Sequence, residues 1–274
     1  MKKHLIPMFV LTLVSCQQQS QPPEVALPPV KQDQQQPTQT AKRSIQPAQE
    51  SESPIEQPPP IHREEGRRNS LRVAERDKMI LDVPIISQNP ELKYGCEVTS
   101  LAMVLQYAGV QVDKMQLASQ LPRDDDPIRR TPSGDITHWG NPNHGFVGDI
   151  TGKRAGYAIF VEPLEKLMAR YLPNRTVNLT GRDFDEILGH VKENKPVIVW
   201  TTGDFKAPDR WEGWKHKGEY IKTPLDLHAV VLVGYDPDFY YVNDPLTGNK
   251  AQKVNKASFL ESWRALGKQA LSYE

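Results

Sequence analysis

Apolar residues recur at helical spacing in the region that follows residue 80. The strongest case is a helix predicted over 96–108, in which nine of 13 residues are apolar. Its repeating positions are Val98, Leu101, Ala102, Leu105 and Ala108. Because this helix is so apolar, we expect it to be buried on most sides. We expect it to end at Gly109. Shorter helices are predicted over 113–121, 162–172 and 182–194.

The later part of the chain carries apolar runs that are typical of strands. Strands are predicted over 196–202, 227–235, 239–244 and 269–273, with a last helix near 256–266. Asp236-Pro237-Asp238 separates two of these runs and predicts a hairpin loop. A short strand is also predicted over 81–86, at a sheet edge because Pro84 cannot donate to a central ladder. A helical front half and an antiparallel back half indicate an α+β domain.

Composition separates this folded domain, 79–274, from what precedes it. Residues 17–60 contain 12 Gln and 10 Pro with no apolar periodicity. The longer segment 17–78 contains no aromatic residue. Such a segment cannot bury enough apolar surface to offset the entropy of ordering it. We therefore expect 16–78 to be an extended, disordered tether with a charged linker; an interaction tail is the alternative.

The N-terminal residues resemble a targeting signal. A basic start is followed by the apolar run Leu5 to Val14, which predicts a secretory signal peptide over 1–15. The segment Leu13-Val14-Ser15-Cys16 resembles the lipobox of bacterial lipoproteins, and this resemblance implies that Cys16 is acylated. The domain would then be held at the extracytoplasmic face of the cell membrane by lipid chains. An incidental thiol at Cys16 is the alternative.

Charge and cysteine content exclude several classes of protein. From residue 79 onward there are 23 basic and 25 acidic residues without a basic stripe, so we expect no nucleic-acid partner. The chain has only two cysteines, Cys16 and Cys96, and their contexts differ too much for a structural pair. A disulfide framework and a zinc site built on several thiolates are both excluded.

Cys96 is the first candidate for chemistry. It opens the predicted helix over 96–108, directly after Gly95. The unpaired N–H groups and partial positive charge of a helix N-terminus favour a thiolate, which is the nucleophilic form of cysteine. The same N–H groups could stabilise an oxyanion. From this residue alone, a small buried apolar side chain is an equally open interpretation.

Three further residues complete a possible constellation. His228 lies 132 residues after Cys96 and begins a predicted central strand. If the hairpin loop is three residues long, Tyr235 faces Phe239 and Val230 faces Asp244, which puts Asp244 on the face of His228. A register change of one residue would exchange Asn243 for Asp244. Gln88, eight residues before Cys96, could donate to an oxyanion, although loop glutamines are usually solvated.

The order Gln88, Cys96, His228 and Asp244 resembles that of papain-like cysteine peptidases. The local sequence is similar to that of the bacteriocin double-glycine leader peptidases and their stand-alone relatives. Three segments carry this similarity: Val83-Pro84 to Met103 with Gly95-Cys96-Glu97, His228 to Tyr235, and Val242-Asn243-Asp244-Pro245. The resemblance spans residues 80–273. It implies a papain-like fold in which the helix bearing the nucleophile packs on an antiparallel sheet.

The resemblance also implies roles and a reaction. Cys96 would be the nucleophile, His228 the base, Asp244 the orienting acid and Gln88 the oxyanion donor of a cofactor-free, monomeric cysteine peptidase. Gly95-Cys96-Glu97 replaces the Asp-Cys-Gly common in the leader peptidases, and no transporter segment follows. The implied substrates are therefore peptides or wall-linked peptides in general. An inactive peptidase-like binding module and a cell-wall amidase or transamidase are the alternatives.

Polar segments supply weaker candidates. The long segment 122–156 has no clear period, and loops of this length in compact domains tend to be functional walls or lids. It contains Trp139 and His144, while Trp211 and Trp214 lie in a later segment that we expect to be a loop. These four are candidate substrate-binding residues, with ordinary surface packing as the alternative.

No metal site is expected from the sequence. His138 and His144, with Asp135 and Asp149 nearby, match no ligand spacing. The run 124–126 of three aspartates is more typical of a solvated turn than of a cation site.

Overall fold

The computed structural model describes residues 78–274. The predicted signal peptide over 1–15, the lipidation of Cys16 and the tether up to residue 77 lie outside the described residues. Among the helices of 78–274, none has the length and apolar character needed to cross a membrane.

Five helices occur in the described part of the chain, and each had been predicted to within two residues. They are α2 (Cys96–Tyr107), α3 (Lys114–Gln120), α4 (Val161–Tyr171), α5 (Phe184–Lys192) and α6 (Lys256–Ala265). Their ends follow local chemistry. Asp113 caps α3, accepting from the N–H groups of Met115 and Gln116 at 2.8 Å. Gly109 adopts φ +88° after α2, a conformation that glycine enters without strain.

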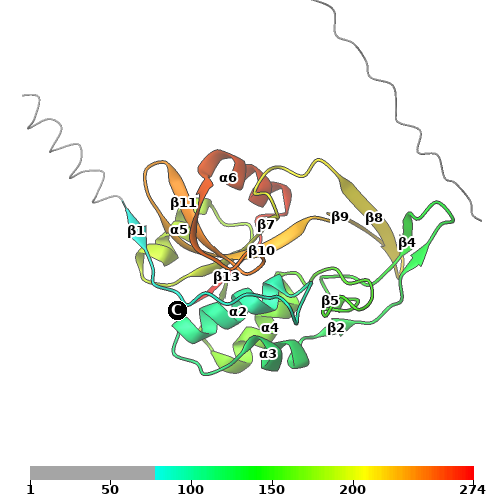
Figure 1. Cartoon of the computed structure of the whole chain (residues 1–274), viewed down its shortest axis with the longest axis horizontal. Helices are drawn as coiled ribbons and strands as arrows, with labels where there is room; N and C mark the ends of the chain where they lie inside the picture. Colours follow the sequence, from blue (N-terminus) through cyan, green and yellow to red (C-terminus); the bar gives the residue numbers. More distant parts are fainter. Residues whose placement is uncertain (1–77) are drawn as a thin grey trace, which may run out of the picture. The chain divides into compact units, whose positions relative to one another are not determined.

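The main sheet has seven strands, and all of its pairings are antiparallel. Along the sheet the order is β12 (Asn249–Asn255), β11 (Phe239–Asp244), β10 (Leu227–Tyr235), β7 (Val197–Thr202), β13 (Ala270–Tyr273) and β6 (Thr176–Asn178). The short β1 (Met79–Ile80) pairs with the end of β10. Helix α2 packs against β10 and β7 (Figure 1), as the papain-like arrangement requires. The predicted α+β class is confirmed.

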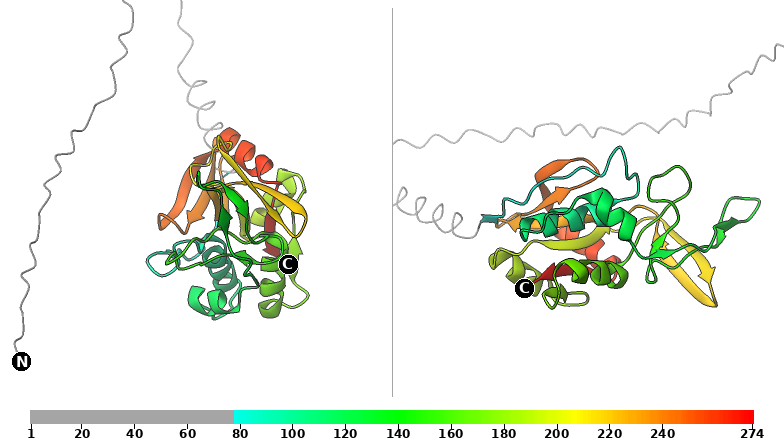
Figure 2. Two further views of the ribbon diagram at one scale, coloured as in Figure 1. Left: turned by 90° about the vertical axis from the view of Figure 1, so that its right-hand side faces the viewer. Right: turned by 90° about the horizontal axis from the view of Figure 1, so that it is seen from below.

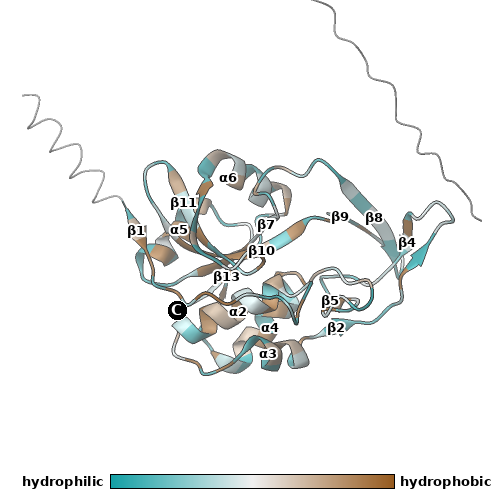
Figure 3. Cartoon of the chain, viewed as in Figure 1, coloured by the Kyte–Doolittle hydropathy of each residue, from teal (hydrophilic) through white to brown (hydrophobic). Residues whose placement is uncertain are grey.

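Burial explains which strands the sequence revealed. Strand β7 is buried along its whole length and β10 is buried except at its two ends, so both carry continuous apolar runs. In Figure 3 the apolar colour is prominent on α2, whereas β8 (Trp211–His216) is pale or hydrophilic. Strands β12 and β6 lie at the two edges of the sheet and are mostly polar, and the sequence did not predict them.

The edge strand predicted over 81–86 is wrong in position. Pairing covers only Met79 and Ile80, with one further bond from the Leu81 N–H to the Val233 oxygen at 2.8 Å. Beyond Leu81 the chain leaves the sheet, because Pro84 has no N–H to continue the ladder. The oxygen of Val83 instead accepts from the side chain of Asn243 at 3.0 Å.

A second, smaller sheet lies beyond one end of the main sheet (Figures 1 and 2). Its order is β3 (Arg129–Arg130), β4 (Ile136–His138), β8 (Trp211–His216) and β9 (Glu219–Pro224). A parallel pair, β2 (Arg123–Asp124) and β5 (Phe146–Val147), lies in the same part of the sequence. The segment 122–156 thus contains four short strands.

The interpretation of Trp211 and Trp214 as loop residues is wrong. Both belong to β8, which pairs with β9 across the hairpin from Trp211 opposite Pro224 to His216 opposite Glu219. Only Trp214 and His216 of β8 are buried, so the strand lacks a recognisable apolar run. Trp214 packs with Trp139 and Tyr157 in a small apolar cluster of its own.

Candidate active site

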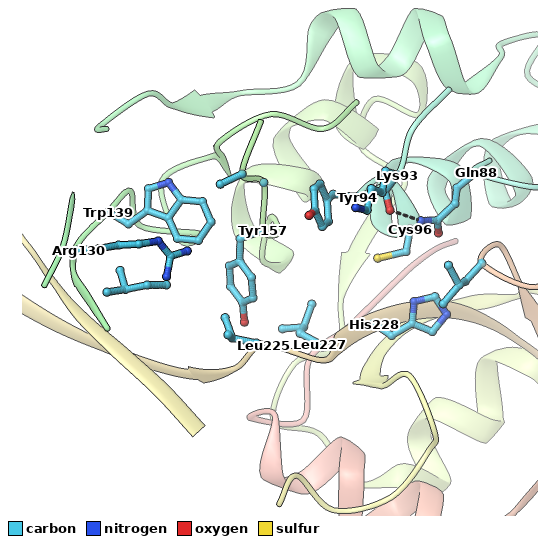
Figure 4. Close-up of a pocket in the computed structure, with 14 residues that line it drawn as sticks. Gln88, Lys93, Tyr94, Cys96, Arg130, Trp139, Tyr157, Leu225, Leu227 and His228 are labelled. Atoms are coloured by element: carbon cyan, nitrogen blue, oxygen red, sulfur yellow. Dashed lines mark hydrogen bonds between the residues drawn. The ribbon is translucent and has the colours of Figure 1, made fainter. Parts of the chain in front are cut away.

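A pocket of about 290 Å³ lies where the two sheets approach each other (Figure 4). One end is formed by Gln88, Cys96 and His228. The walls beyond them are formed by a larger set: Lys93, Tyr94, Arg130, Ile136, Trp139, Ala155, Gly156, Tyr157, Leu225, Leu227 and Leu246. The segment 122–156 contributes five of these lining residues.

Cys96 is the first residue of α2, and the turn before it depends on Gly95. A Cβ on Gly95 would lie 2.5 Å from the Cβ of Leu92 and 3.1 Å from its oxygen. The turn is closed by the Gly95 N–H, which donates to that oxygen at 2.9 Å. A glycine is therefore required for the backbone to approach Leu92 and then enter the helix at Cys96.

The surroundings of Cys96 favour the neutral thiol. Burial raises its pKa well above the ordinary value, and the neighbouring Glu97 raises it further, whereas the Ala229 N–H opposes the shift. The Sγ atom donates to Oε2 of Glu97 at 3.3 Å. The expectation that the helix N-terminus would favour a thiolate is wrong for this state, because desolvation and a carboxyl neighbour outweigh the helix.

Glu97 is a functional candidate that the sequence reasoning missed. Its side chain is fully buried, and burial raises its pKa from 4.5 to about 7. Its Oε1 accepts from the Ile159 N–H at 3.1 Å, while Oε2 faces the thiol. A signal was present: a helix predicted to be buried on most sides places a carboxyl beside Cys96 in the interior.

His228 and Asp244 are in direct contact. His228 Nε2 lies 2.7 Å from Asp244 Oδ1, and both side chains are buried. Burial works against ionisation of Asp244, but His228, Thr247 and the Leu246 N–H hold its pKa below the ordinary value. Because Nε2 is engaged in this way, Nδ1 is the imidazole nitrogen left for other partners. In Figure 4 the His228 ring lies at the same end of the pocket as Cys96 and Gln88.

The strand register that makes this contact differs in part from the one expected. Near the turn, Tyr235 pairs with Tyr240 and not with Phe239. A bulge between Leu232 and Gly234 then shifts the register, so that Val231 faces Asn243. The predicted alignment of Asp244 with the strand face of His228 therefore holds, although the turn was predicted one residue too short.

Asn243, the alternative third residue, points elsewhere. Its Nδ2 donates to the Val83 oxygen at 3.0 Å, and its Oδ1 accepts from the Ala251 N–H at 2.9 Å. These bonds tie β11 to the segment after β1 and to β12. Asn243 is therefore a structural residue in this fold, with no contact to His228.

Gln88 is held at the pocket by two hydrogen bonds. Its backbone N–H donates to the Pro245 oxygen and its Nε2 to the Lys93 oxygen, both at 2.8 Å (Figure 4). The bond to Lys93 fixes the amide orientation, since a carbonyl there would face another carbonyl. The bond to Lys93 uses one Nε2 proton and leaves the other free, and the buried Oε1 has no hydrogen-bond partner within 78–274.

The four candidate substrate-binding residues lie in different parts of the structure. Trp139 lines the pocket with Cys96, whereas the other three do not. Trp214 is buried in the second cluster and donates through Nε1 to the Gly140 oxygen at 2.8 Å. Trp211 lines a different pocket, under Lys222. His144 lies 3.5 Å from Asp124, in a His and Asp cluster whose members do not line the Cys96 pocket.

Comparisons with known proteins agree with this geometry. The chain is 35% identical over 205 residues to the uncharacterized protein YvpB of Bacillus subtilis (strain 168), a match that covers 74% of this chain and 79% of that protein. It is 42% identical to a solved structure of a protein assigned as a C39-like peptidase from Bacillus anthracis. That match has a TM-score of 0.66 and covers 72% of this chain and 97% of the other.

The family comparison covers the whole folded domain. The model of the Peptidase_C39-like family matches residues 80–271, which include Gln88, Cys96, His228 and Asp244. The domain has the mixed helix and antiparallel-sheet architecture of papain-like peptidases. The chain belongs to the Peptidase_C39-like family.

Proposed function

We propose that this protein is a cysteine peptidase that cleaves peptide or amide bonds through Cys96, His228 and Asp244. The observation that carries this proposal is the 2.7 Å contact between His228 Nε2 and Asp244 Oδ1, in a pocket that also contains Cys96. The contact fixes the ring orientation and leaves Nδ1 as the base. A carboxylate in this position stabilises the imidazolium that forms when the thiol gives up its proton.

The reaction follows from these positions. His228 Nδ1 takes the thiol proton as the Cys96 sulfur attacks the substrate carbonyl carbon, and the carbonyl oxygen becomes an oxyanion. The free Nε2 proton of Gln88 and the N–H groups at the start of α2 stabilise that oxyanion. The imidazolium then protonates the leaving amine as the C–N bond breaks. Water attacks the resulting thioester, gives a proton to His228 and releases the acid and the thiol.

Glu97 sets the resting state of the nucleophile. The thiol of Cys96 donates to Glu97, and the pKa of the thiol is raised. Cys96 is therefore a neutral thiol in the resting state and must pass its proton to His228 during attack. Protonation of Glu97, whose pKa is about 7, removes the negative charge next to the sulfur. The activity would therefore depend on this neighbour as well as on the triad.

The raised thiol pKa also favours one alternative, a binding domain that keeps the pocket without chemistry. Labelling of Cys96 separates the two functions. In a Cys16→Ser background Cys96 is the only thiol, so iodoacetamide incorporation reports on it alone. If the protein is a peptidase, iodoacetamide should alkylate Cys96 at neutral pH in the folded state. The alkylation should be slower after His228→Ala. Labelling that is equal in both variants, or seen only after unfolding, supports the binding domain.

Cleavage itself is tested with a peptide library and mass spectrometry, comparing the Cys16→Ser protein with the same protein carrying Cys96→Ala. New termini that require Cys96 establish peptidase activity. Release of amines from purified cell wall, without cleavage of unstructured peptides, would show an amidase or transamidase instead. Products that form equally with Cys96→Ala would reject Cys96 as the nucleophile.

We further propose that the domain acts at the extracytoplasmic face of a membrane, held by a lipid on Cys16. The lipobox-like Leu13-Val14-Ser15-Cys16 supports this placement. The wild-type protein should partition into the detergent phase and the membrane fraction, and Cys16→Ser should move it to the aqueous fraction. An unchanged partition after Cys16→Ser would reject the lipid anchor.

A further inference from the structure

A cluster of metal-ligating side chains lies at the junction of three segments outside the Cys96 pocket. Asp124 comes from β2, His216 from the end of β8, and His144 from the turn between β4 and β5. The Oδ2 atom of Asp124, a ring nitrogen of His144 and a ring nitrogen of His216 all lie within 4.8 Å of one another. Residues separated by 92 positions in the sequence are thus brought to one point.

His216 provides an independent sign that a ligand belongs here. Its side chain has no exposed surface, and within residues 78–274 neither ring nitrogen has a hydrogen-bond partner. Nε2 is nevertheless 2.9 Å from Asp124 Oδ2 and 3.0 Å from Asp126 Oδ2. A buried ring nitrogen that faces two carboxylate oxygens without hydrogen-bond geometry is costly unless a cation lies between them.

The separations suit a tetrahedral ion. Bonds of about 2.0–2.1 Å to nitrogen and oxygen at tetrahedral angles put neighbouring ligand atoms roughly 3.3 Å apart. The separations from Asp124 Oδ2 are 2.9 Å to His216 Nε2 and 3.5 Å to His144 Nδ1. Asp126 Oδ2 lies 3.0 Å from His216 Nε2 but is not one of the three ligand atoms that all lie within 4.8 Å of one another, so a water molecule would complete the tetrahedron.

The donor chemistry selects the ion. Two imidazoles and one carboxylate suit Zn²⁺ or a similar first-row cation, whereas Mg²⁺ and Ca²⁺ favour oxygen ligands alone. Two protein groups compete or assist at the edge of the cluster. Lys217 Nζ lies 3.6 Å from Asp126 Oδ2, and His138 Nε2 lies 3.9 Å from the same oxygen.

We propose that Asp124, His144 and His216 bind one Zn²⁺ ion with a structural role. None of the three lines the pocket of Cys96, so the ion would not touch the substrate there. It would join β2, β8 and the turn that carries His144. Trp139 packs against Trp214 of β8 with ring centres 5.6 Å apart, so the ion would hold the pocket wall to which Trp139 belongs.

Zinc content tests the proposal directly. The full-length protein, stripped with a chelator, is titrated with Zn²⁺ against a chromophoric chelator, and the bound metal is counted by mass spectrometry. We expect one Zn²⁺ per chain and a loss of affinity of more than about 100-fold for His216→Ala and His144→Ala, since hydrogen-bond partners of metal ligands alone contribute 10- to 100-fold. His190→Ala, a partly buried histidine on α5, is the matched control and should keep full affinity.

A spectroscopic and a thermal readout complete the test. Co²⁺ added to the stripped protein should give the visible absorption of a tetrahedral site, absent in His144→Ala, whose ring is half exposed and whose loss should not prevent folding. Chelator should lower the Tm of the wild type, and Zn²⁺ but not Mg²⁺ should restore it. Absence of stoichiometric Zn²⁺ in the wild type, or equal binding by His144→Ala and His190→Ala, would overturn the proposal.

Discussion

The thiol of Cys96 donates to the carboxyl group of Glu97 at 3.3 Å, although the two residues are neighbours at the start of the same helix. Both side chains are buried; Glu97 raises the pKa of the thiol, whereas the hydrogen bond from the thiol favours the charged carboxylate of Glu97. The pocket therefore contains an acid beside the nucleophile as well as a base across from it. Because the pKa of Glu97 is about 7, the charge beside Cys96 changes near neutral pH.

Replacement of this acid should activate the thiol. Glu97→Gln keeps a side-chain oxygen that can accept from the Ile159 N–H and replaces the carboxylate beside the sulfur with an amide donor. The pKa of Cys96 should fall, so alkylation by iodoacetamide at pH 8 in the Cys16→Ser background should be several-fold faster. Glu162→Gln, which changes an exposed first-turn glutamate of α4, should leave the rate unchanged. Slower alkylation in Glu97→Gln would contradict the assigned role.

The same residue should shape the pH dependence of stability. The pKa of Glu97 is about 7 in the folded protein, against 4.5 ordinarily, so the native state binds this proton more tightly than the unfolded state. The stabilisation is complete below pH 4.5 and is lost as pH rises to about 7, a change of about 3 kcal/mol by linkage. Denaturant unfolding of wild type and Glu97→Gln across pH 4–8 isolates this contribution. Parallel stability curves for the two proteins would show that Glu97 titrates normally.

Substitution of Asp244 should mainly lower activity, whereas substitution of Asn243 should mainly lower stability. Asp244→Ala removes the partner of His228 Nε2 and should lower kcat/KM by roughly 100-fold or more, and slow alkylation of Cys96. Asn243→Ala removes bonds to Val83 and Ala251 and should cost roughly 1–3 kcal/mol of stability with a much smaller loss of activity. Peptide cleavage and denaturant unfolding measured on both variants test the pair. Activity that survives Asp244→Ala but not Asn243→Ala would reverse the assignment.

Gln88 should act on the transition state. Gln88→Ala removes the amide that stands beside Cys96, and loss of one oxyanion donor typically lowers kcat by about 100- to 1,000-fold. The KM should change little, because the donor acts on charge that develops during attack. Steady-state kinetics on one peptide substrate separates the two constants. Asn89→Ala, which changes the next residue in an exposed position, serves as the control; a loss expressed only in KM would mark Gln88 as a substrate-binding residue instead.

The sequence predicted those parts of the fold whose burial leaves a periodic trace. Helix α2 and strands β7 and β10 are surrounded by other elements, so their apolar runs were visible. The hairpin of β8 and β9 buries few side chains on a small sheet, and its residues looked like a loop. Its position beside β4 is a tertiary contact that no local pattern records.

The site divides in the same way. His228 and Asp244 lie in one hairpin, so strand geometry alone placed them together. In the sequence, Glu97 was noted only as a departure from a motif. Its effect on the Cys96 thiol depends on burial of the side chain and on the hydrogen bond from the Ile159 N–H, which only the folded chain provides. The cluster of Asp124 and His216 depends on two segments far apart in the chain, and ligand spacing along the sequence could not reveal it.

The bulge in β10 separates the length of the hairpin turn from the alignment of the triad. The residue between Leu232 and Gly234 takes up the difference between the pairing of Tyr235 near the turn and that of Val231 further along. Relatives could therefore lengthen or shorten the turn at 236–239 by one residue, with a compensating change at the bulge, while His228 and Asp244 stay opposed. A change of one residue in the turn would thus be absorbed at the bulge before it reached His228 and Asp244.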